Sequence, residues 1–196
     1  MSMASYLLQG QWTTNVRTLT DYGSGAHDDV TVVFPNVPDG WFFLAPTALS
    51  GLPDDKGKQL IVRPHPDTFE EPLAEFAFAG WAYKWGVFRN NSNNYGLWTP
   101  KRVPEGYVCL GDMFWYNQPP HMQVTPKAVS QKCVVEVPVG ACIWSDHGTG
   151  AQDDGSMWSI EDGRPGAARF FVAQSGYDKP RATAWALNWA VVEMIG

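Results

Sequence analysis

Short runs of β-branched and aromatic residues, separated by glycine and proline, make up most of the chain. Residues 30–34, Val-Thr-Val-Val-Phe, are typical of a strand because branched side chains pack well on a pleated surface. Residues 35–40 end that run with turn chemistry, and Pro64, Pro66 and Pro72 exclude a long helix further on. The pattern predicts strands at residues 11–20, 30–34, 41–44, 60–62, 76–88, 95–99, 107–111, 132–137, 141–144, 156–159 and 170–173.

The last long stretch, residues 181–192, alternates alanine with larger residues and is also predicted to be a strand. In the other repeated units, the corresponding strand runs directly into a polar loop. The loop that this last strand would precede is the first one, at residues 23–29. We therefore expect it to lie beside the N-terminal strand and to close a ring. The alternative is an amphipathic helix, since Trp185, Asn188, Trp189 and Val192 also share one helical face.

One polar loop sequence occurs twice. Gly-Ser-Gly-Ala-His-Asp-Asp at residues 23–29 and Gly-Thr-Gly-Ala-Gln-Asp-Asp at 148–154 share five of seven positions and lie 125 residues apart. Between them, the amides of residues 90–94, Asn-Asn-Ser-Asn-Asn, end 65 residues after Asp29 and 60 before Asp154. The spacing predicts three repeated units within a single domain: residues 12–75, 76–132 and 133–196.

Units of about 60 to 65 residues with three or four strands each are longer than most propeller blades. Three of them predict an all-β fold of β-prism type, with three antiparallel sheets in pseudo-threefold symmetry. Closure of the ring would also remove exposed sheet edges. Equivalent apolar positions predict two inward layers: Val33, Trp98 and Trp158 in one, and Trp41, Tyr107 and Phe170 in the other.

Composition supports strands and narrows the range of partners. Ten Trp, ten Phe and seven Tyr beside 19 Gly and 15 Pro fit aromatic-rich strands joined by turns. A net charge of -6 without a Lys or Arg cluster argues against nucleic acid or an anionic membrane. No stretch is apolar enough for a transmembrane helix. Residues 1–8 lack the features of a signal peptide, which predicts a cytoplasmic protein, with unconventional secretion as the alternative.

Three cysteines, Cys109, Cys133 and Cys142, are too few for a disulfide scaffold and form no metal-binding pair. We expect buried free thiols, as in cytosolic proteins. A bridge such as Cys109 to Cys133 is the alternative if the chain is exported.

The repeated loops carry the polar side chains best suited to a ligand. Glycine and alanine let a ligand approach the backbone, and neighbouring carboxylates or amides can bond to vicinal hydroxyls. We therefore predict carbohydrate binding by Gly25, Ala26, Asp28 and Asp29, by Asn93 and Asn94, and by Gly150, Ala151, Asp153 and Asp154. The alternative is structural: glycine supplies positive φ and aspartate caps the turn.

Trp115 is the aromatic candidate for the same role. Trp98, Trp158 and Trp185 fall at repeat-equivalent or alternating strand positions, which predicts burial. Trp115 precedes Asn-Gln-Pro-Pro at residues 117–120, in a predicted outer turn. An exposed indole there would stack on a sugar ring or on a peptide proline.

Metal binding and catalysis have less support. Six aspartates offer oxygen ligands for Ca²⁺ without EF-hand spacing: Asp21, Asp28 and Asp29, and Asp146, Asp153 and Asp154. Four histidines are scattered in loops without zinc spacing: His27, His65, His121 and His147. No nucleophile elbow or phosphate-binding loop occurs, and adjacent aspartates seldom face one glycosidic bond. We expect no enzyme, no cofactor and no metal.

Residues 95–112 contain Tyr-Gly-Leu-Trp-Thr-Pro and Pro-Glu-Gly-Tyr-Val-Cys-Leu-Gly-Asp, which resemble the motif of the vacuolar-protein-sorting sixty-two-like family. The Gly-x-Gly-Ala-x-Asp-Asp loops and Lys-Cys-Val at residues 132–134 are also similar to that family, over most of the chain. Two elements depart from it: Phe34-Pro35 replaces Trp-x-Pro, and no proline follows Trp158. The resemblance implies repeated β units and a role in trafficking. Related repeats bind short proline-containing peptides.

The sequence thus predicts a non-catalytic binding module, foremost for carbohydrate. A trafficking adaptor that binds proline-containing peptides in a groove or on a sheet edge is the alternative. A toxin or defence component that uses glycan binding to reach a target cell is a further one.

Overall fold

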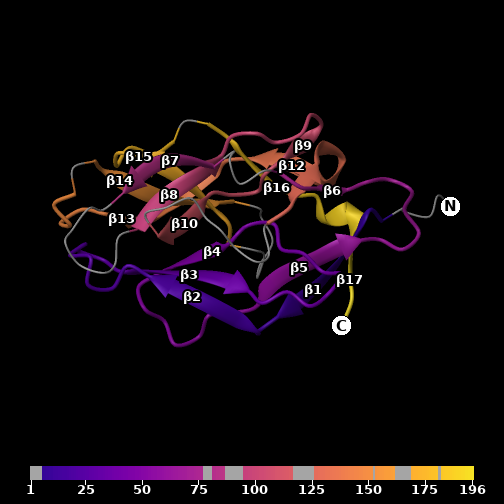
Figure 1. Ribbon diagram of the computed structural model, residues 1–196, viewed down its shortest axis with the longest axis horizontal. Helices are drawn as coiled ribbons and strands as arrows, with labels where there is room; N and C mark the ends of the chain where they lie inside the picture. The colour runs from indigo at the N-terminus through magenta and orange to yellow at the C-terminus, as the bar shows by residue number, and fades with distance from the viewer. Residues whose placement is uncertain are drawn as a thin grey trace.

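The computed structural model describes residues 6–76, 81–86, 95–116, 126–151, 153–161, 169–180 and 182–196, with only the backbone for 81–86, 95 and 116. Helix in this part of the chain is confined to two three-residue 3₁₀ turns, Gln131–Cys133 and Trp189–Val191. The strands form small sheets of two or three (Figure 1). The prediction of an all-β fold is confirmed.

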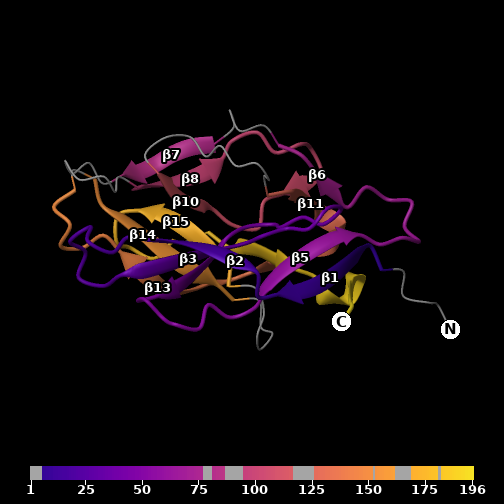
Figure 2. The same cartoon turned by 60° about the horizontal axis from the view of Figure 1, so that its bottom comes forward.

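Three of these sheets each have a central strand flanked by strands from the same third of the chain. They are β2–β3–β4 (Val16–Thr20, Val30–Pro35, Thr47–Ser50), β7–β8–β10 (Trp81–Gly86, Tyr95–Pro100, Met113–Tyr116) and β13–β14–β15 (Val139–Ser145, Gly155–Ile160, Phe171–Ser175). The central strands begin at Val30, Tyr95 and Gly155, 65 and 60 residues apart, as the polar loops predict. All three sheets gather toward one end of the molecule (Figures 1 and 2).

The other sheets lie toward the opposite end, where both termini are found (Figure 1). They are β17–β1–β5 (Val192–Met194, Leu8–Thr13, Gln59–Pro64), β6–β11–β9 (Leu73–Ala74, Ala128–Ser130, Tyr107–Val108) and β12–β16 (Val134–Val137, Ala184–Leu187). Among the described strands, every pairing except β1 with β17 is antiparallel.

The central strands contribute equivalent residues to one core. Val32, Leu97 and Met157 are fully buried in the same cluster. The predicted layer lies one residue further along each strand; Val33 and Trp98 are buried there, but Trp158 is partly exposed. Successive strand side chains point to opposite faces, so a one-residue error exchanges the faces.

The second predicted layer is correct for one member, since Phe170 is buried whereas Trp41 and Tyr107 are partly exposed. Residues 41–44 were predicted as a strand, but Phe42 makes only an isolated bridge to Val62. Strand β7 covers part of the strand predicted at residues 76–88, and its register shifts between Tyr83 and Trp85.

The C-terminal stretch is divided between two sheets. Ala184–Leu187 pairs with Val134–Val137, and Val192–Met194 alone pairs with the N-terminal strand, in parallel. Between them, the Asn188 side chain accepts a hydrogen bond from the Ala190 amide at 3.1 Å and turns the chain. The helical alternative for this stretch is wrong, because four of its residues are extended in a ladder.

The three cysteines are free thiols: Cys133 is buried, Cys109 is partly buried and Cys142 is exposed. The alternative bridge between Cys109 and Cys133 is absent. Burial raises the pKa of the Cys109 thiol to about 12 and that of Cys133 to about 11. In the described part of the chain, no helix has the length and apolarity needed to cross a membrane.

Candidate functional site

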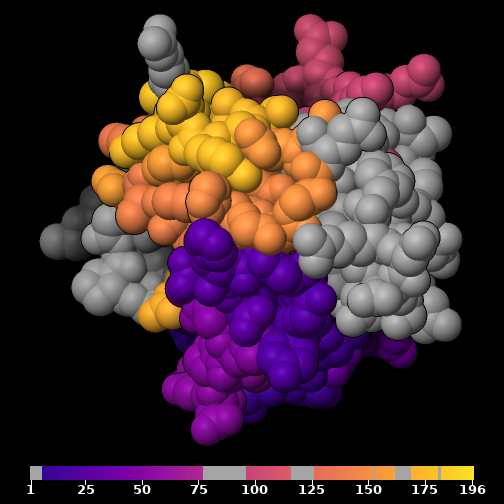
Figure 3. All heavy atoms as spheres, turned by 90° about the vertical axis from the view of Figure 1, so that its left-hand side faces the viewer, coloured from indigo at the N-terminus to yellow at the C-terminus, as the bar shows by residue number. Residues whose placement is uncertain are grey.

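Two loops far apart in sequence meet at the end of the molecule opposite the termini. We call residues 21–29 and 146–154 the loop pair; they are drawn in indigo and orange at the left of Figure 1, and their atoms adjoin in Figure 3. The His27 amide donates to the His147 carbonyl at 2.8 Å, and the two imidazole rings make an edge contact with centroids 4.7 Å apart. The four histidines are scattered along the sequence, but the fold brings His27 and His147 into contact.

A buried carboxylate holds the first loop. Asp21 is 1% exposed and accepts hydrogen bonds from the Val30 amide at 2.6 Å, the Ser24 hydroxyl at 3.1 Å and the Trp144 indole at 2.8 Å. The Trp144 bond comes from β13, so Asp21 also ties the two parts of the loop pair together. Burial raises the pKa of the Asp21 carboxyl, and its hydrogen bonds oppose the shift.

Asp146 repeats this arrangement in the second loop. It is 2% exposed and accepts from the Gly155 amide at 3.0 Å and from the Thr149 hydroxyl at 3.2 Å. Burial raises the pKa of this carboxyl too. The side-chain oxygen of Ser24 in turn accepts from the Ala26 amide at 3.1 Å, as that of Thr149 does from Ala151 at 3.0 Å.

The structural alternative therefore explains much of the repeated sequence. Gly25 and Gly150 have φ of 91° and 66°, which glycine adopts without steric cost. Gly148 is constrained twice: its φ is 96°, and an added Cβ would lie 2.5 Å from the His27 ring. Turn geometry and the contact between the loops account for these glycines without a ligand.

The aspartates predicted to bind carbohydrate are not buried turn carboxylates like Asp21 and Asp146. Asp28, Asp153 and Asp154 are exposed and Asp29 is half-buried, while Ala26 and Ala151 are half-buried beneath them. Asp154 accepts a hydrogen bond from the Tyr177 hydroxyl at 3.0 Å. Desolvation, followed by that bond, raises the Tyr177 pKa.

One exposed tyrosine, Tyr177, contacts the second loop, and another, Tyr22, follows Asp21 in the first loop. Tyr22 is 65% exposed and Tyr177 is 40% exposed, and the Tyr177 ring makes an edge contact with His147 at 5.5 Å. His27 and His147 are themselves exposed. Neither tyrosine is among the site residues predicted from the sequence, although Tyr22 directly follows Asp21 and precedes the first glycine of the repeat.

The remaining predicted site residues are Asn93, Asn94 and Trp115. Asn93 and Asn94 lie outside the described residues. Trp115 was predicted in an exposed turn, and this is wrong: it is 9% exposed in β10 and packs edge-on against Phe34, with ring centroids 5.7 Å apart. The Arg17 guanidinium lies 5.7 Å from the Trp115 ring centroid. Trp115 is a core residue because β10 lies against β3 rather than at the rim.

Within the described residues, no three His, Cys, Asp or Glu side chains converge as a metal site would require. The proposed calcium ligands Asp21 and Asp146 direct their oxygens at amide and hydroxyl donors instead.

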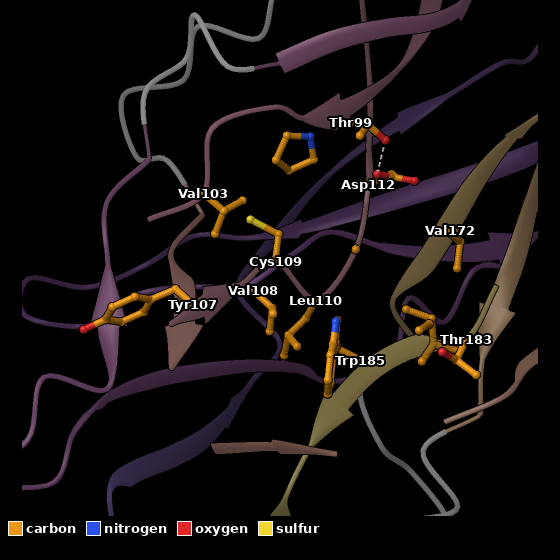
Figure 4. A pocket seen from close by; sticks show the side chains of 14 residues that line it. Thr99, Val103, Tyr107, Val108, Cys109, Leu110, Asp112, Val172, Thr183 and Trp185 are labelled. Atoms are coloured by element: carbon orange, nitrogen blue, oxygen red, sulfur yellow. Dashed lines mark hydrogen bonds between the residues drawn. The ribbon is translucent and has the colours of Figure 1, made fainter. Parts of the chain in front are cut away.

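A pocket lies elsewhere, between the middle of the chain and residues of β14, β15 and β16. It has a volume of about 330 Å³ and is lined mainly by apolar side chains that include Val103, Tyr107 and Trp185 (Figure 4). Asp112 in its wall accepts from the Thr99 hydroxyl, and from the Ala173 amide at 2.7 Å. No local pattern in the sequence indicates this pocket, because its walls combine residues 99–112 with Ile160, Val172 and residues 183–185.

The chain matches no protein-family model and no curated protein. Among solved structures it is similar to the crystal structure of GNIP1Aa from Chromobacterium piscinae, with a TM-score of 0.80 and 22% sequence identity. The alignment covers 97% of this chain and 39% of that one. The likeness shows that the two share this fold.

Proposed function

We propose that this chain is a non-catalytic carbohydrate-binding module whose site is the exposed surface of the loop pair. The observation that carries the proposal is the meeting of the two loops through His27 and His147. This contact brings together two distant loops that carry exposed carboxylates, with Tyr177 against His147 and Asp154.

The chemistry of that face suits sugars. Asp28 and Asp153 offer acceptors for pairs of hydroxyl groups, and adjacent glycines leave the backbone accessible. The exposed Tyr22 ring provides an apolar body for the C–H face of a sugar ring and a polar tip for its hydroxyls, and the Tyr177 ring adds a second apolar face.

The two halves of the site are not equivalent. Tyr177 donates to Asp154, whereas the residue 125 positions earlier is Leu52, which has no hydroxyl to offer Asp29. A sugar must therefore compete with Tyr177 in the second loop but not with Leu52 in the first. We expect tighter binding at the first loop.

The proposed architecture is the β-prism with pseudo-threefold symmetry. Three sheets with the same local strand order support it, as does one pair of hydrogen bonds. The Thr31 hydroxyl donates to the Gly51 carbonyl at 2.8 Å, and the Ser156 hydroxyl donates to the Gly176 carbonyl at 2.7 Å, with each residue displaced by 125 positions. Membership of the vacuolar-protein-sorting sixty-two-like family stays a prediction.

A glycan array with the wild-type chain, followed by titration calorimetry with the glycans it selects, tests the proposed function. Asp28→Asn with Asp29→Asn should weaken binding most, and Asp153→Asn with Asp154→Asn should weaken it less. Asp39→Asn, at an exposed aspartate in another turn, is the matched control and should bind as wild type. A folded wild-type chain that binds no glycan contradicts the proposal.

A further inference from the structure

The loop at residues 65–72 presents one apolar side chain to solvent. Phe69 is fully exposed, at 106% relative accessibility, the highest value among the exposed large apolar residues of the described chain. Single exposed apolar side chains are common on protein surfaces, but burial of a fully exposed phenylalanine against a partner would favour binding.

This loop is also held firmly in place. The Thr68 amide donates to the His65 carbonyl at 3.0 Å, and the Glu70 amide donates to the Thr68 hydroxyl at 3.1 Å. Glu70 pairs with Lys132 at 2.7 Å. The side chain is therefore presented on an ordered turn, which lowers the entropy lost when a partner binds it.

The pocket described above lies next to this loop. Tyr107 lines the pocket, and its hydroxyl donates to the Glu71 carbonyl at 2.6 Å, two residues from Phe69. Figure 4 shows the Tyr107 ring at one edge of the pocket with its hydroxyl directed away from it. Phe69 and the pocket consequently share one region of the surface, and the Phe69 of the same chain does not fill the pocket.

The charges around the two features are complementary. Phe69 is flanked by exposed Asp67, Glu70 and Glu71. Exposed Lys101 and Arg102 lie between the lining residues Pro100 and Val103 at the pocket. The carboxylate in the pocket wall, Asp112, is engaged with Thr99 and Ala173. The rim thus favours an acidic segment that carries an aromatic residue, and residues 67–71, Asp-Thr-Phe-Glu-Glu, are such a segment.

We propose that a second copy of this chain is the partner, with Phe69 of each copy inserted into the pocket of the other. Because the loop and the pocket adjoin, a twofold axis allows both insertions at once and gives a closed dimer. The pocket volume of about 330 Å³ is at the lower end of the range of small-ligand sites, roughly 300–1,000 Å³, and admits a phenylalanine side chain. The surface lies away from the loop pair, so this proposal does not depend on the carbohydrate proposal.

Sedimentation velocity over a range of concentrations tests the dimer with the full chain. Wild type should show a concentration-dependent monomer–dimer equilibrium, and Phe69→Ala should weaken it by about 30-fold or more, as for a central aromatic anchor. Leu52→Ala, at an apolar side chain that is 46% exposed on another loop, is the matched control and should dimerise as wild type. At a concentration low enough for all three chains to be monomeric, both variants should keep the wild-type melting temperature.

A charge exchange separates docking from a change in folding. In the proposed dimer the acidic loop of one copy meets the basic rim of the other. Arg102→Glu and Glu71→Arg should therefore each weaken the dimer, and the double variant should recover part of the loss because loop and rim again carry opposite charges at these positions. A chain that stays monomeric at about 0.5 mM, or a dimer that Phe69→Ala leaves unchanged, overturns the proposal. Binding of a proline-containing peptide to the pocket of a monomeric wild-type chain would identify another occupant and would equally overturn it.

Discussion

Asp21 offers the sharpest test of how the loop pair is built. Asp21→Ala removes three hydrogen bonds made to one buried carboxylate and leaves the fully buried Val30 amide without this acceptor. A hydrogen bond to a charged group contributes about 1.5–3 kcal/mol, and an unpaired buried amide costs about 1–3 kcal/mol. Release of the carboxylate from its buried site offsets part of the loss. We therefore expect the free energy of unfolding to fall by about 3 kcal/mol.

Denaturant unfolding followed by tryptophan fluorescence measures this change. The midpoint should shift while the slope stays the same, because the surface exposed on unfolding is little altered. Asp39→Ala, at an exposed aspartate, should change stability by less than about 0.5 kcal/mol. A loss below about 1 kcal/mol for Asp21→Ala would refute the reasoning that Asp21 organises the loop.

The raised pKa of Asp21 adds a pH dependence with a definite sign. The folded state binds the proton more tightly than the unfolded state, so this group contributes stability at low pH that is lost as pH rises through the raised value. Asp21→Asn removes that contribution. The variant should therefore be more destabilised, relative to wild type, below about pH 4 than at pH 7.

Three further predictions concern a glycine in the second loop, the cysteines and Tyr177. Gly148→Ala should destabilise by about 2–3 kcal/mol because the Cβ meets the His27 ring, while Gly23→Ala, with φ of 82° and no atom within 4 Å of the Cβ, should cost about 1 kcal/mol; equal losses would contradict the contact. Thiol labelling at pH 8 should modify exposed Cys142 first and buried Cys133, whose pKa is about 11, only on unfolding; rapid labelling of Cys133 in the folded chain would contradict its burial. Tyr177→Phe should strengthen glycan binding at the second loop, because it frees a carboxylate oxygen; calorimetry showing weaker binding would mean that the hydroxyl itself contacts the sugar.

Local patterns were enough to predict most of the longer strands and the spacing of the three central ones, but not β4 or β11, and the strand predicted at residues 41–44 is wrong. The run at residues 30–34 forms β3 with one added residue, and the loop spacing gave the starts of β8 and β14. The inward layer was misplaced by one residue because Val32 and Val33 are alike in sequence and differ only in which face the partner strands cover. Hydrophobicity alone does not distinguish the two faces of a strand that is buried on both.

The candidate site could not be predicted from local patterns, because it is formed by a contact between residues far apart in the sequence. The contact of His27 with His147 spans most of the chain, and nothing adjacent to either residue indicates it. Asp21 was a different case, since a sequence signal was present: Asp21 and Ser24 recur as Asp146 and Thr149, each displaced by 125 positions. An aspartate three residues before a serine or threonine, repeated with the loop, indicates a buried turn carboxylate rather than a metal ligand.

The most direct test of carbohydrate binding at the loop pair is a two-dimensional amide NMR titration of the labelled chain with a glycan selected by the array. The account predicts saturable shifts of the amides in residues 23–29 and 148–154, including Gly25, Asp28 and Asp153, with the first loop responding at lower concentration. Amides near Tyr107 and Trp185 in the pocket should not move. Shifts confined to the pocket, or none at saturating glycan, would contradict the central claim.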